Sequence, residues 1–103
     1  MGTALWSVSK SGYTNQNVAG RYVDGGATTT STTGTDLDNG AAGGGTDITA
    51  NKGDILTIVM DEAARVMFGG ETATQTVGHI VPADIPVNLE VSGSGKISVC
   101  DIA

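Results

Sequence analysis

Residues 55–68, which read ILTIVMDEAARVMF, carry the strongest secondary-structure signals in the chain. Ile55–Met60 is a short run rich in β-branched residues, which is typical of a buried strand. Asp61–Ala64 predicts a short connection. Arg65–Phe68 then predicts a second strand, which ends at Gly69–Gly70 because paired glycines interrupt regular structure.

Further short strand signals follow this stretch. Thr74–Val81 includes an extended piece that ends at Pro82, and Val87–Val91 alternates apolar and polar residues with a period of two. Neither segment, nor any other in the chain, shows a sustained period of 3.6 residues. These signals predict strands rather than helices.

The end of the chain predicts one more strand. Ser92–Gly95 has the length and composition of a four-residue hairpin connection. Lys96–Ile102 alternates again, with Ile97, Val99 and Asp101 on one face. Several short strands separated by glycine-containing turns predict an all-β fold, specifically a small β-sandwich or barrel-like module.

The composition changes sharply upstream of this module. Residues 24–51 are almost wholly Thr, Gly, Asp and Ala, and their sizeable apolar side chains are Leu37 and Ile48. Burial of each stabilises by about 1.5–3 kcal/mol, whereas ordering each backbone costs about 1–2 kcal/mol. We therefore predict that residues 1–51 form an extended Gly/Thr-rich arm ordered mainly by partner contact, and that residues 52–103 form the β module.

The arm contains the residue types that most often anchor protein interfaces. The predicted partner-binding residues are Trp6, Tyr13, Arg21, Tyr22, Leu37 and Ile48. The alternative is that the aromatic residues and the arginine complete the core of the β module. With 4% aromatic residues and 16 glycines, the core is expected to be small, which favours a homo-oligomer or docking onto a larger partner.

The charge of the chain argues against two classes of partner. The net charge is −6, with five Lys and Arg residues. Because five basic residues cannot neutralise many phosphates, we expect no nucleic-acid partner. An anionic membrane surface is disfavoured for the same reason, and no apolar run approaches the roughly 18 residues of a membrane span.

The residues that could carry chemistry do not form a recognisable set. A cysteine nucleophile needs a histidine partner, and nothing in the sequence places His79 near Cys100. We interpret Cys100 as a small residue on a strand face and His79 as a partly buried or interface residue. No catalytic residue and no cofactor are predicted.

Two acidic segments were considered as sites. Asp36–Asp47 resembles the start of a calcium loop, but its glycine falls one position early and the bidentate glutamate is missing. It is interpreted as an Asp/Gly-rich loop, with calcium binding left open. Asp61–Glu62 is interpreted as a solvated connection, because adjacent residues on a strand point in different directions. No metal site is predicted.

From Arg65 onward the sequence resembles small virion-associated proteins of tailed bacteriophages. The shared order is a strand of the form R-V-x-F-G, a Thr/Ala-rich loop, an apolar-Pro element and a final V-x-x-G-x-K-I-x-V element. The matching residues are Arg65, Val66, Phe68, Gly69, Thr72–Thr74, Ile80–Pro82 and Val91–Val99, including Lys96 and Ile97, with the glycine of the last element one position later, at Gly95.

This resemblance implies a virion structural protein, and the lack of a nucleophile–base pair or ligand set separately predicts that the chain is not an enzyme. The expected role is a capsid decoration or cement protein on the capsid surface, which binds the major capsid protein and stabilises capsomer contacts, with a trimer favoured. Contacts that are weak singly add up when they are repeated across a shell. Alternatives are a phage fibre, spike or tail-adaptor subunit, or a small ligand- or carbohydrate-binding β module with an exposed aromatic platform or a calcium site.

Overall fold

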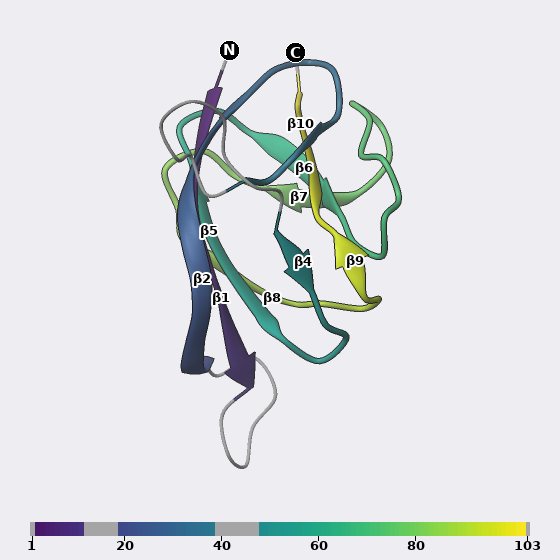
Figure 1. Ribbon diagram of the computed structural model, residues 1–103. Coiled ribbons are helices and arrows are strands. Elements are labelled where there is room, and N and C mark those ends of the chain that lie inside the picture. The colour runs from purple at the N-terminus through teal and green to yellow at the C-terminus, as the bar shows by residue number, and fades with distance from the viewer. Residues whose placement is uncertain (1, 12–18, 39–47, 103) are drawn as a thin grey trace.

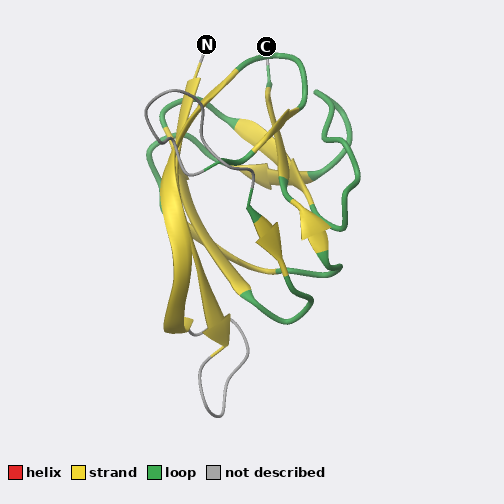
Figure 2. Cartoon of the chain, viewed as in Figure 1, coloured by secondary structure: helices red, strands yellow, loops and turns green. Residues whose placement is uncertain are grey.

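A computed structural model of the chain describes residues 2–11, 19–38 and 48–102, with side chains except those of residues 11 and 19–24 (Figure 1). All regular structure in these ranges is β (Figure 2), so the predicted all-β fold is confirmed. Since these ranges contain strands, turns and loops, they include no helix with the length and apolar character of a membrane span.

Two four-stranded sheets make up most of the fold. In the first, called sheet A, every neighbouring pair is antiparallel. Its order is β2 (Ala19–Thr30), β1 (Gly2–Ser11), β5 (Ile55–Met60) and β8 (Val87–Glu90). The central pair is β1 and β5, so the strand predicted from Ile55–Met60 is flanked on both sides.

The second sheet, sheet B, contains the C-terminal strand and is also antiparallel. Its order is β3 (Thr35–Asp36), β10 (Ser98–Asp101), β6 (Ala64–Met67) and β7 (His79–Val81). A further two-stranded sheet pairs β4 (Thr49–Ala50) with β9 (Gly95–Lys96). Figure 1 shows sheet A on one side of the molecule and the strands of sheet B and the small sheet on the other.

The core lies between the sheets, as expected for a β-sandwich. Alternate residues of β1 and β5 point into it, because successive side chains of a strand point to opposite faces. Buried core residues come from both sheets and from the connections: Ala4, Trp6, Val8, Leu56, Ile58, Met60, Ala64, Val66, Phe68, Val81, Val91, Ile97 and Val99. The partly buried Val87 and Leu89 of β8 pack against the same cluster.

The N-terminal half differs from the predicted extended arm. Residues 4–9 of β1 pair with β5, and the core contains Leu37 and Ile48 as well as residues of β1. The prediction compared the entropy lost on ordering residues 24–51 only with the burial of their own apolar side chains. In the structure, β2 forms a ladder with β1 and turns the hydroxyls of Thr28 and Thr30 inward, where both are hydrogen-bonded. Buried threonine side chains thus complete a core that was predicted to be small from the number of large apolar residues.

Two of the connections that cross from one sheet to the other bear on the predicted strands. The predicted hairpin at Ser92–Gly95 is wrong, because β8 pairs with β5 in sheet A whereas β10 pairs with β3 and β6 in sheet B. The connection after Met60 likewise carries the chain from β5 to β6 in the opposite sheet. Periodicity identifies such strands but does not identify their partners, which depend on contacts distant in sequence.

Candidate functional site

Three of the four exposed large apolar side chains in the described part of the chain fall within residues 77–85, which include β7. They are Val77 (50%), Ile80 (60%) and Ile85 (55%). β7 is the last strand of sheet B, so one of its edges is not paired within that sheet. We call residues 77–85 the apolar edge segment. Exposed apolar groups on an edge strand are typical of a surface that binds another protein.

Arg65 holds the loop that leads into this segment. Its Nε donates to the carbonyl oxygen of Gln75 at 3.1 Å, and its guanidinium Nη1 donates to that of Gly78 at 2.9 Å. The amide of Ala73 donates to Ser98 Oγ of β10 at 2.9 Å, and Ala73 itself is buried. The loop between β6 and β7 is therefore attached to sheet B at three points, which limits the entropy lost when a partner binds there.

Three of the residues predicted to bind a partner are described with their side chains, and they lie outside the apolar edge segment. Trp6, Leu37 and Ile48 are buried in the core of the chain itself, which for Trp6 is the alternative left open by the sequence. The burial of all three differs from the contact role predicted for them. The other predicted anchors, Tyr13 and the side chains of Arg21 and Tyr22, lie outside the described part of the chain.

Cys100 and His79 occupy one sheet but opposite faces of it. Cys100 lies across from Arg65, and Arg65 lies across from Ile80, so these three share a face. His79 precedes Ile80 and therefore points to the other face, where its ring lies 5.7 Å from that of Phe68. This arrangement does not allow the thiol and the imidazole to act on each other directly.

Burial determines the properties of the Cys100 thiol. The side chain is buried under the loop after β2, and its Sγ donates to the carbonyl oxygen of Thr32 at 3.2 Å. Loss of solvation, together with the neighbouring Asp101 carboxylate, raises the pKa of Cys100. The thiol therefore remains protonated, and poorly nucleophilic, to a higher pH in the folded chain than in the unfolded chain.

Alkylation of Cys100 by iodoacetamide at pH 8 is expected to be at least about 100-fold slower in buffer than in urea, because reaction requires local opening. Since the folded pKa lies above the unfolded value, this group leaves stability unchanged below the unfolded pKa. It lowers the free energy of unfolding as pH rises from the unfolded towards the folded pKa. Alkylation followed by mass spectrometry measures the expected difference in rate between buffer and urea. Equal rates in buffer and in urea would contradict it.

The structure describes part of the calcium-like segment Asp36–Asp47 and all of Asp61–Glu62. Asp36 is exposed on β3, with a carboxylate oxygen 4.0 Å from Lys96 Nζ. Residues 39–47 of the calcium-like segment lie outside the described part of the chain. Asp61 and Glu62 are exposed, in agreement with a solvated connection. Within residues 2–11, 19–38 and 48–102, no three His, Cys, Asp or Glu side chains are grouped so that they could hold a metal ion.

Sequence reasoning missed features that the structure brings together. The sequence predicted an extended piece within Thr74–Val81, but it did not predict that the side chains of Val77 and Ile80 would be exposed. Asp54 closes a turn after Asn51, with its amide donating to the carbonyl oxygen of Asn51 at 3.0 Å. The burial of its carboxylate against Lys10 Nζ, at 3.1 Å, was not foreseen.

The chain is a small all-β module in which one edge strand, β7, carries the exposed apolar side chain of Ile80. Comparison with protein-family models, with curated proteins and with solved structures found no match to this chain.

Proposed function

We propose that this chain is a virion structural protein, a capsid decoration protein that binds the outer shell and stabilises contacts between capsomers. The observation that carries the proposal is the apolar edge segment, which offers exposed Ile80 on an edge strand, with exposed Val77 before it and Ile85 after it in the sequence. A strand of a capsid protein can add to such an edge through main-chain hydrogen bonds, while the apolar side chains supply buried area.

The attachment of the neighbouring loop supports the same role. A decoration protein must bind in one geometry at many equivalent positions, so a contact surface that is already ordered has an advantage. Arg65 and Ser98 supply that order through their hydrogen bonds to the loop. The resemblance to phage virion proteins includes both Arg65, which holds the loop, and Ile80, which is exposed on the edge strand. A trimer on the capsid surface remains part of this proposal.

The test uses heads of the phage that encodes the chain, prepared without it. Added protein is expected to sediment with the heads and to raise the temperature at which they release DNA. Ile80→Lys places a charge in the contact and is expected to weaken binding at least about tenfold, in the range of interface hot-spot losses. Thr49→Lys, at an exposed position of β4, is the matched control and should bind normally.

The position of the protein on the virion distinguishes a capsid decoration protein from a fibre, spike or tail-adaptor subunit. Labelled protein found only at the tail vertex would favour a fibre, spike or tail-adaptor subunit. Failure of the unmodified protein to bind heads or tails would overturn the virion role altogether.

A further inference from the structure

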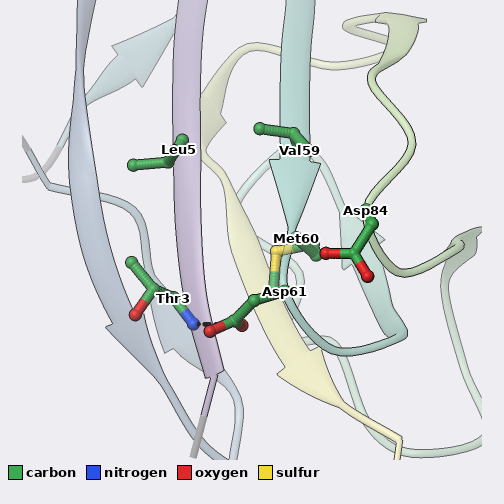
Figure 3. Close-up of a pocket in the computed structure, with 6 residues that line it drawn as sticks. All are labelled: Thr3, Leu5, Val59, Met60, Asp61 and Asp84. Carbon is green, nitrogen blue, oxygen red and sulfur yellow. Dashed lines mark hydrogen bonds between the residues drawn. The ribbon is translucent and has the colours of Figure 1, made fainter.

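A shallow pocket lies at one end of the outer face of sheet A, the face turned away from the core (Figure 3). Its volume is about 220 Å³. The lining residues are Thr3, Leu5, Val59, Met60, Asp61 and Asp84. They come from β1, from β5 and its end, and from the connection between β7 and β8, so elements distant in sequence build one site.

The pocket has an apolar part and a charged part. Leu5 and Val59 lie directly across from each other in the β1–β5 ladder, and Leu5 is 54% exposed although it sits in the middle of a sheet. Figure 3 shows the carboxylates of Asp61 and Asp84 beyond this pair, towards the same end of the pocket as Thr3. An apolar surface therefore leads to two negative charges.

The two carboxylates are held in different ways. Asp61 accepts a hydrogen bond from the amide of Thr3 through Oδ1 at 2.7 Å, which fixes its orientation. The carboxylate of Asp84 makes no hydrogen bond or ion pair with any residue in the described ranges, and no Lys or Arg lines the pocket. Two like charges that share a concave surface, in a chain of net charge −6, attract a cation.

The backbone places Asp84 rather than leaving it on a free loop. Its amide donates to the carbonyl oxygen of Met60 at 2.6 Å, and Ala83 forms a parallel bridge with Met60. Its φ is 62°, a left-handed conformation that Asp adopts more readily than most residues. The backbone that carries this carboxylate is thus held at the rim of the pocket before any partner arrives.

We propose that this pocket binds a lysine or arginine side chain presented by a partner protein, with the aliphatic stem on Leu5 and Val59 and the charged group at Asp61 and Asp84. Long basic side chains combine an apolar stem with a cationic end, which matches the two parts of the pocket. A bare divalent cation would require about six oxygen ligands, whereas Leu5 and Val59 offer only apolar side chains. The inference goes beyond the proposed function, because it holds for any protein partner.

The test is an NMR titration of the isotopically labelled full chain. The probes are two capped tripeptides, acetyl-Gly-Lys-Gly-amide and the same peptide with norleucine in place of lysine. The lysine peptide is expected to shift the methyl signals of Leu5 and Val59 and to saturate with a dissociation constant on the order of 1 mM. Equal shifts with norleucine, or shifts that map away from the pocket, would overturn the proposal.

Asp84→Asn removes the charge while keeping a residue that tolerates positive φ. It is expected to weaken binding of the lysine peptide about threefold, the size of effect measured for exposed ion pairs. Glu90→Gln removes an exposed acidic group from β8, outside the pocket, and should leave the affinity unchanged. Equal weakening by both variants would show that the affinity depends on the net charge of the chain rather than on the pocket, and would contradict the proposal.

Two other occupants give distinct results. Calcium chloride that shifts Asp84 at concentrations below those of the lysine peptide would replace the proposal with a metal site. Methyl shifts of Leu5 that change with protein concentration alone would assign the pocket to contact with a second copy, and this too would overturn it. Neither result depends on binding to phage heads, so failure here is distinguishable from failure of the virion role.

Discussion

Replacing Trp6 with alanine is expected to lower the free energy of unfolding by about 3–5 kcal/mol, the range for removing a large buried aromatic side chain. Trp6 is 5% exposed and belongs to the core cluster. It lies across from Ile58 in β5 and from Gly26 in β2, whose missing side chain leaves room for the indole. Small neighbours of this kind cannot refill the space that the indole vacates.

The indole also closes a polar cluster in the core. Its Nε1 donates to Thr28 Oγ1 at 3.2 Å and to the carbonyl oxygen of Asp38 at 3.1 Å. Thr28 is itself bonded to both the amide and the carbonyl of Asp38, so it keeps partners when the indole is lost. We therefore expect most of the effect of Trp6→Ala to come from lost packing, and Trp6→Phe to cost about 1–2 kcal/mol.

The measurement is urea denaturation followed by far-ultraviolet circular dichroism, because the substitution removes the single tryptophan. Leu5→Ala is the matched control, since Leu5 precedes Trp6 on the same strand but is 54% exposed. It is expected to cost less than about 1 kcal/mol. A loss for Trp6→Ala as small as the one expected for Leu5→Ala would show that the indole is not part of the core. A domain of this size has about 5–15 kcal/mol in total, so Trp6→Ala should fold only marginally.

The strands of the C-terminal half were predictable because their signal is local. The runs now seen as β5, β6 and β8 alternate or are uniformly apolar, and such patterns follow from the two faces of a strand. Their pairing was not predictable from the same signal. β5 and β6 are separated by three residues and yet belong to different sheets, because the partner of β5 is β1, about 50 residues upstream.

The exposed surfaces were harder to foresee than the strands. Ile80 and Leu5 have the residue type of core positions, and only their place at a sheet edge or on an outer face exposes them. Asp84 reaches the pocket through a backbone bridge to Met60 that no sequence pattern marks. Burial of Trp6, by contrast, was an open alternative, because one sequence cannot show whether a large aromatic side chain is covered by its own chain or by another.

Replacing Asp101 with alanine is expected to lower the free energy of unfolding by about 3–4 kcal/mol. Asp101 is 2% exposed and is the last residue of β10. One carboxylate oxygen accepts from Thr30 Oγ1 at 2.6 Å, and the other accepts from the amide of Gly2 at 2.9 Å. Alanine would leave two buried donors without an acceptor, each at a cost of about 1–3 kcal/mol.

Substitutions at the same site separate charge from hydrogen bonding. Asp101→Asn keeps one carbonyl acceptor but turns an amide nitrogen towards a donor, so it is expected to cost about half as much. Thr30→Val removes one donor and leaves the bond from Gly2, with an expected loss of about 1–2 kcal/mol. Glu90→Ala, at an exposed acidic position of β8, is the control and should stay within about 0.5 kcal/mol of the unmodified protein.

Trp6 fluorescence in urea measures these losses, because each of these variants retains the buried indole. Hydrogen exchange supplies a local readout, since the Gly2 amide should lose protection in Asp101→Ala more than amides of β5 do. The reason is geometric: Asp101 joins β10 of sheet B to the start of β1 in sheet A, and also to Thr30 at the end of β2. A loss for Asp101→Ala no larger than that for Glu90→Ala would show that this carboxylate does not tie the two sheets together.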